Sequence, residues 1–99
     1  MDTLTWIQKW YAQHCNGDWE HSYGVKIQTV DNPGWSVEID LTDTYLEDMP
    51  FDEIEEERNE EDWFYCIVRD GIFHGAGGAI NLGEILDSFK NWAAHVDQD

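Results

Sequence analysis

Apolar and polar residues alternate along the stretch from Trp35 to Leu41. The apolar positions are Trp35, Val37, Ile39 and Leu41, and polar residues separate them. A period of two is typical of a strand with one buried face. The stretch 23–30 alternates more weakly. The sequence DNPG at 31–34 predicts a type II β-turn in which Pro33 takes the second turn position and Gly34 the third. We therefore predict a hairpin over residues 19–41, on which the rest of the chain packs.

Two other stretches have apolar residues at helical spacing. The first is residues 3–15, with Gly17 in the segment that ends it. In the second, Asn81 is a good N-cap residue and Glu84 follows three positions later, as in a capping box. Its apolar positions are Leu82, Ile85, Leu86, Phe89, Trp92, Ala93 and Val96. We expect a helix near each end of the chain.

The apolar run WFYCIVR at 63–69 predicts a central strand. Asp70-Gly71 is a hairpin signal, so residues 72–76 are expected to return as a further strand. The order is then α-β-β-β-β-α. We predict an α+β fold, a four-stranded antiparallel sheet flanked by an N-terminal and a C-terminal helix, in one domain spanning residues 1–99.

The chain is strongly acidic yet rich enough in apolar residues to fold. It has 41% hydrophobic residues and six tryptophans, against a formal net charge of -17. Such a surface repels nucleic acid and anionic membranes and attracts basic proteins. We therefore expect no nucleic-acid partner and no membrane partner.

The start of the chain, MDTLTWIQKW, lacks a basic region followed by an apolar run, and no stretch is apolar enough to span a membrane. We expect a cytoplasmic protein. Cys15 and Cys66 are read as reduced thiols, and a single disulfide between them stays open as an alternative.

Residues 43–62 contain eleven acidic residues and one basic residue, Arg58. We expect the segment to be held at its start by apolar residues, with 52–59 as a short frayed helix in an exposed loop. Plain solvation explains such a run less well than a basic partner does, because like charges repel each other. The candidate partner-binding carboxylates are Glu47, Asp48, Asp52, Glu53, Glu55, Glu56, Glu57, Glu60 and Glu61.

The sequence gives weaker support for catalytic, metal-binding or phosphate-binding sites. Neither cysteine lies in an environment that would favour a thiolate, and the histidines show no metal-ligand spacing, so we predict no catalytic residue, no metal and no cofactor. Gly75 to Gly78 lacks the pattern of a phosphate-binding loop and is better explained as a turn. Asp18, Glu20 and His21 are compatible with acid–base work, but we favour a structural role or, with Trp19, contact with a partner.

Several motifs together resemble the immunity protein 53 family of bacterial polymorphic-toxin systems. They are WIQKWY at 6–11, GDWEHSYG at 17–24, TVDNPGW at 29–35 and FKNW at 89–92. The resemblance implies a small non-catalytic protein that binds and blocks a cognate toxin, which the charge suggests is basic. Two alternatives stay open: a cysteine- or histidine-dependent, sulfurtransferase-like enzyme, and a general acidic adaptor or nucleic-acid mimic. The oligomeric state is not predicted.

Overall fold

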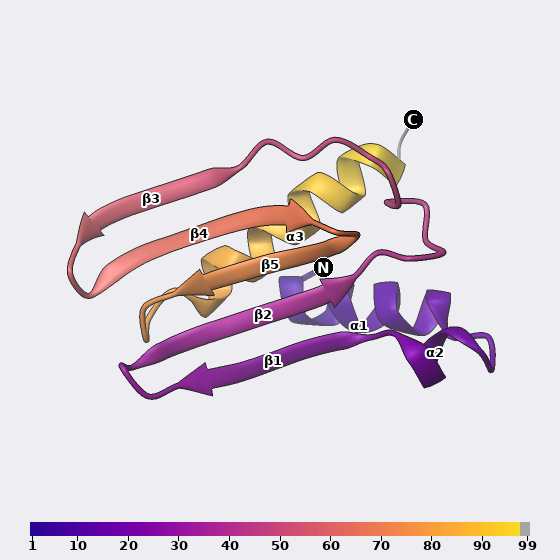
Figure 1. Ribbon diagram of the computed structural model, residues 1–99, viewed down its shortest axis with the longest axis horizontal. Coiled ribbons are helices and arrows are strands. Elements are labelled where there is room, and N and C mark those ends of the chain that lie inside the picture. The colour runs from indigo at the N-terminus through magenta and orange to yellow at the C-terminus, as the bar shows by residue number, and fades with distance from the viewer. Residues whose placement is uncertain (98–99) are drawn as a thin grey trace.

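The computed structural model describes residues 1–97 as a five-stranded antiparallel sheet with two long helices behind it (Figure 1). In chain order the elements are α1 (Thr3–His14), α2 (Trp19–Ser22), β1 (Val25–Val30), β2 (Gly34–Asp40), β3 (Ile54–Asn59), β4 (Asp62–Arg69), β5 (Ile72–Gly77) and α3 (Leu82–Asp97). The strand order is β1-β2-β5-β4-β3, so the last strand occupies the centre of the sheet.

The core lies between the sheet and the helices. On β2, Val37 and Ile39 are fully buried, as the alternation predicts. The ring of Phe89 on α3 meets those of Phe73 on β5 and Trp10 on α1 edge to face, with centroids 5.2 and 5.1 Å away. Large aromatic side chains remove much apolar surface from water, so this cluster ties both helices to one face of the sheet.

Much of the predicted architecture is confirmed. The α+β class, the two terminal helices and the strands at 34–40, 62–69 and 72–77 are all present. Asp70 and Gly71 both have positive φ, 56° and 76°, as a type I′ hairpin turn requires. Gly17, after α1, also has positive φ.

The sheet has five strands, and the prediction of four was wrong. Residues 54–59 form β3, an edge strand paired with β4, rather than a frayed helix over 52–59. A helix would place glutamates three and four residues apart on the same side, where they repel each other. In a strand, consecutive glutamates point to opposite faces, and Ile54 pairs with Cys66 at the edge of the core.

The start of the predicted hairpin is also corrected. Residues 19–22 form the single turn α2 instead of continuing the strand. Local hydrogen bonds favour this turn, because Asn16 Oδ1 accepts from the backbone N–H groups of Asp18 and Trp19, each at 2.9 Å. Trp19 is thereby placed in the core, 4% exposed.

The turn between β1 and β2 is not type II. The Asn32–Pro33 peptide bond is cis, and Gly34 has no positive φ but pairs with Val30 as the first residue of β2. A side chain at Gly34 would collide with the carbonyl oxygen of Gly77 on the neighbouring strand. Glycine is therefore needed here for the close approach of two backbones, and not for turn geometry.

Candidate partner-binding surface

The first half of the acidic segment is a loop, residues 41–53, anchored to α3. Leu46 is fully buried, and the Tyr45 hydroxyl donates to the backbone oxygen of Ala93 at 3.2 Å. The Trp92 indole N–H donates to the backbone oxygen of Pro50 at 2.9 Å. The predicted apolar anchoring of this segment is confirmed, and it leaves Glu47 and Asp48 on the exposed side.

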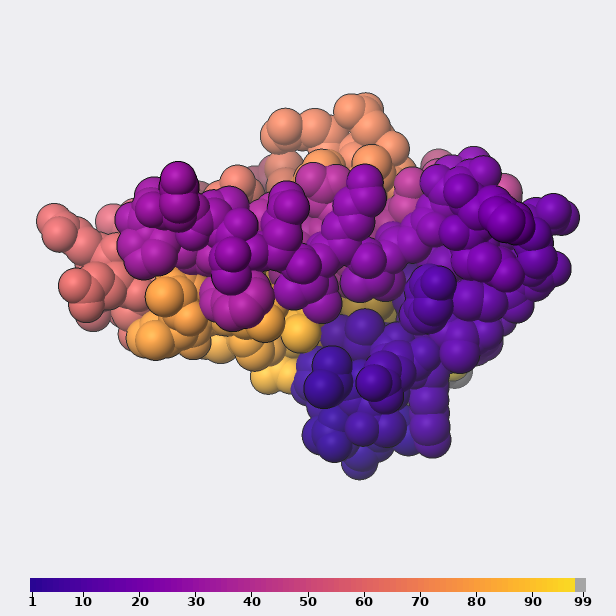
Figure 2. Space-filling model, turned by 90° about the horizontal axis from the view of Figure 1, so that it is seen from below, coloured from indigo at the N-terminus to yellow at the C-terminus, as the bar shows by residue number. Residues whose placement is uncertain are grey.

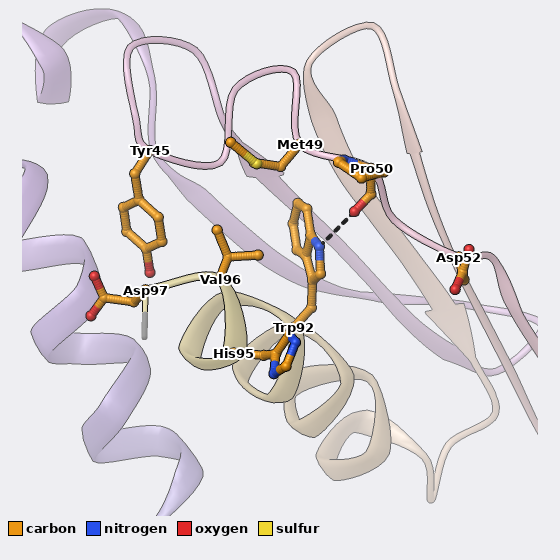
Figure 3. A pocket seen from close by; sticks show the side chains of 8 residues that line it. All are labelled: Tyr45, Met49, Pro50, Asp52, Trp92, His95, Val96 and Asp97. Carbon is orange, nitrogen blue, oxygen red and sulfur yellow. Dashed lines mark hydrogen bonds between the residues drawn. The ribbon is translucent and has the colours of Figure 1, made fainter. Parts of the chain in front are cut away.

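A cavity of about 770 Å³ lies between this loop and the end of α3 (Figure 3). Its residues are Tyr45, Met49, Pro50, Asp52, Trp92, His95, Val96 and Asp97. The walls are mainly apolar, and the indole of Trp92 stands across the middle with its N–H bonded to Pro50 (Figure 3). The cavity is therefore bounded by the acidic loop that the sequence singled out.

The second half of the acidic segment is β3 and the hairpin that leads into β4. In the register with β4, Glu55 lies opposite Tyr65 and Glu57 opposite Trp63, on the face of the sheet away from the helices. Glu56 lies opposite the buried Phe64 and points to the helix side. All nine acidic candidates named from the sequence are exposed, in the loop, on β3 or in its hairpin.

The one basic residue of the segment is already engaged. The Arg58 guanidinium lies 3.0 Å from Asp62 Oδ1 and 2.6 Å from Glu84 Oε1. Its hydrogen bonds, with further ones from Asn81, hold the pKa of both carboxyls below their usual values. Arg58 therefore offsets the charge of two carboxylates that lie outside the candidate set.

Asn81 is fully buried and joins the start of α3 to β4. It directly precedes the helix, as predicted, and its backbone oxygen accepts from Ile85 N–H. Its side-chain amide donates to Glu84 at 2.8 Å and to Asp62 at 2.9 Å, and its oxygen accepts from Trp63 N–H at 3.3 Å. These contacts replace the reciprocal backbone bonds of a capping box.

Trp19, Glu20 and His21 lie elsewhere. They precede β1, at the opposite edge of the sheet from β3. The Trp19 indole donates to the backbone oxygen of Thr42 at 2.9 Å, and backbone N–H groups donate to the Glu20 carboxylate and lower its pKa. His21 is exposed. Trp19 and Glu20 thus have structural contacts, and the three lie apart from the carboxylates of β3.

The cysteines occupy different environments, and both are free thiols. Cys66 is 1% exposed, and burial raises the pKa of its thiol to about 11, which disfavours the nucleophilic thiolate. Cys15 is half-buried just after α1 and lies 3.3 Å from the backbone oxygen of Tyr11. Within residues 1–97, no three His, Cys, Asp or Glu side chains are grouped so as to hold a metal ion.

One surface was not recognised in the sequence. The open face of the sheet, in front of the helices in Figure 1, carries Trp63, Tyr65 and Ile67 of β4. Figure 2, which views the sheet along its β1 edge, shows α1 on one side of the sheet only. The run WFYCIVR predicted a central strand but not which of its faces is open. Arg69 at its end follows the alternation of Trp63, Tyr65 and Ile67, which marks that face as solvent-facing.

None of the helices in the described part of the chain is long and apolar enough to cross a membrane. No curated protein and no solved structure matches the chain significantly. Residues 4–94 match the family model described as immunity protein 53, which covers most of the sequence. The match includes most of both terminal helices, the whole sheet and the whole acidic segment 43–62, and the chain therefore belongs to the immunity protein 53 family.

Proposed function

We propose that this protein neutralises a basic toxin domain by binding it and covering its active or substrate-binding surface, without catalysis of its own. The family supports a toxin-neutralising role. The basic character of the toxin and the non-catalytic mode of action come from the charge and from the environment of the cysteines. The bound surface is proposed to include the exposed acidic residues of 47–61.

The observation that carries this proposal is the unbalanced charge of the acidic segment. Nine candidate carboxylates are exposed, while Arg58, the basic residue among them, is bound to Asp62 and Glu84. The negative electrostatic potential of these carboxylates accelerates the encounter with a basic protein and disfavours binding of acidic proteins. The same negative charge repels nucleic acid, so we expect the protein to bind the toxin itself and not a nucleic acid.

The test is binding and protection with the toxin domain encoded beside this gene. A triple variant, Glu55→Gln, Glu57→Gln and Glu61→Gln, should weaken binding to a catalytically inactive form of that domain and should flatten the salt dependence of Kd. Co-expression of the triple variant with the active toxin should protect cells less well than the wild type does.

The matched control changes the same number of charges away from the acidic segment, in Asp18→Asn, Asp31→Asn and Asp70→Asn. These residues are exposed, and asparagine tolerates the positive φ of Asp70. Equal losses in both triples would favour a general acidic adaptor, which responds to net charge alone. No loss in either triple would contradict a role for the acidic segment.

A further inference from the structure

The open face of the sheet carries an exposed aromatic pair. Tyr65 is 43% exposed, an unusual value for an aromatic residue on an inner strand, and Trp63 is half-buried. Their rings are stacked, with centroids 6.3 Å apart and planes inclined by 17°. Both side chains therefore form one continuous aromatic surface on β4, directed away from the helices.

Carboxylates border this pair along the β3 edge. Glu55 is the cross-strand partner of Tyr65, and Glu57 is that of Trp63. Directly opposite residues have Cβ atoms about 5 Å apart, so each carboxylate reaches the space above its aromatic neighbour. On the other side, Tyr65 lies opposite Ala76, which in turn pairs with Ser36. These two small side chains leave that side of the tyrosine ring unobstructed.

The surface continues past Trp63 to the end of the sheet. A hollow of about 520 Å³ there is lined by Trp63, Pro33 and Ile80, with Glu60 and Glu61 among its other residues. Ile80 is 73% exposed, the most exposed large apolar side chain in the described part of the chain. An apolar floor with acidic residues around it is typical of a protein-interaction surface.

We propose that this aromatic–acidic surface, made of Glu55, Glu57, Trp63, Tyr65 and Ile80, is the site at which the basic partner docks, through at least one arginine side chain. The inference rests on the proposed function and adds the surface and the contact to it. A guanidinium group stacks on aromatic rings while its N–H groups bind carboxylates, and the pairs Glu55–Tyr65 and Glu57–Trp63 offer both interactions side by side.

Charge decides between a basic partner and a second copy of this chain. Two copies meeting at this face would bring the β3 carboxylates of both together, with a net charge of -17 on each. A basic partner instead replaces that repulsion with attraction. The open face therefore fits a basic partner that carries an arginine, and not a second copy of this chain.

The experiment measures Kd for the catalytically inactive toxin domain encoded beside this gene. Tyr65→Leu keeps an apolar side chain but removes the aromatic face, and it should raise Kd by about tenfold or more. Tyr65→Phe should stay within about threefold of the wild type, because it keeps the ring. Tyr11→Leu is the matched control, since Tyr11 is 39% exposed on α1, on the helix side, and its Kd should not change.

A second readout does not depend on substituting the aromatic residues of the surface. Hydrogen exchange of the complex should show new protection in β3 and β4, and the exposed pair Glu55→Gln and Glu57→Gln should raise Kd while leaving the free energy of unfolding unchanged. Protection confined to the helices, or an unchanged Kd for Tyr65→Leu, would overturn the inference and leave the proposed function standing.

The failure of the proposed function would look different, because the wild type itself would then not bind the toxin domain. Analytical ultracentrifugation of the wild-type protein without the toxin domain completes the test, because it measures whether the protein forms dimers. A dimer that Tyr65→Leu dissociates would show that a second copy covers this face, and it would overturn the inference.

Discussion

Ile85 of α3 packs directly on the backbone of Gly75 in the central strand β5. A Cβ atom at Gly75 would overlap the Cγ2 methyl of Ile85, which is itself fully buried. The helix therefore approaches the sheet closely at this point because the strand has no side chain there.

Gly75→Ala should lower the free energy of unfolding by about 1–3 kcal/mol, since the added methyl overpacks a full core. Urea denaturation measures this change. The control is Gly83→Ala in the first turn of α3, where an added Cβ meets nothing within 4 Å and alanine favours the helix. An unchanged stability in Gly75→Ala would mean that α3 sits further from the sheet than described.

The hydrogen bond from Trp92 to Pro50 should hold the acidic loop onto α3. Trp92→Phe removes this bond and keeps an aromatic ring near Phe51, whose ring centroid lies 5.0 Å from that of Trp92. We expect a loss of about 1 kcal/mol in stability. We also expect faster cleavage after Glu47 by a glutamate-specific protease, and equal cleavage rates would contradict this anchoring role.

The ion pairs of Arg58 should make stability depend on pH in the acid range. Hydrogen bonds from Arg58 lower the folded-state pKa of Asp62 and Glu84 below the usual values of 3.8 and 4.5 for these side chains. The stabilisation is therefore complete above these values and is lost as the pH falls through the lower folded-state pKa values.

Arg58→Met should accordingly destabilise the protein more at about pH 7 than at about pH 3. Denaturant unfolding at the two pH values measures the difference. Lys9→Met removes the same charge from an exposed site on α1 and should show a smaller dependence on pH. An equal effect of Arg58→Met at both pH values would show that these pairs do not contribute to stability.

Cys66 should resist alkylation in the folded protein, because burial raises the pKa of its thiol to about 11. Iodoacetamide labelling followed by mass spectrometry should modify the half-buried Cys15 at least about tenfold faster than Cys66. In urea the two rates should become similar. Rapid labelling of native Cys66 would instead support the cysteine-dependent enzyme considered from the sequence.

The sequence predicted those elements in which local pattern and tertiary packing agree. On β2, the apolar positions Val37 and Ile39 are the buried ones, and Asp70-Gly71 forms the turn that its residue types favour. Along α3, the apolar face contains Ile85 and Phe89, both fully buried. At each of these sites the residue type is sufficient to predict the conformation.

β3 was not predictable in the same way. Its residues Glu55, Glu56 and Glu57 have low strand propensity and no apolar alternation, and only pairing with β4 makes them a strand. Similarly, the hydrogen bonds of Asn16 that form α2 leave no hydrophobic pattern in the sequence. For the candidate surface, the sequence identified the carboxylates but not Trp63 and Tyr65, whose exposure depends on which face the helices cover.

The place of β5 between β2 and β4 has a consequence for the protein during its synthesis. The strands on either side of β5 are joined to each other only through it, since β2 pairs with one of its edges and β4 with the other. A nascent chain that has not yet released residues 72–77 from the ribosome holds two half-sheets with open inner edges. Because domains generally fold as units, the sheet would close only after β5 has left the ribosome.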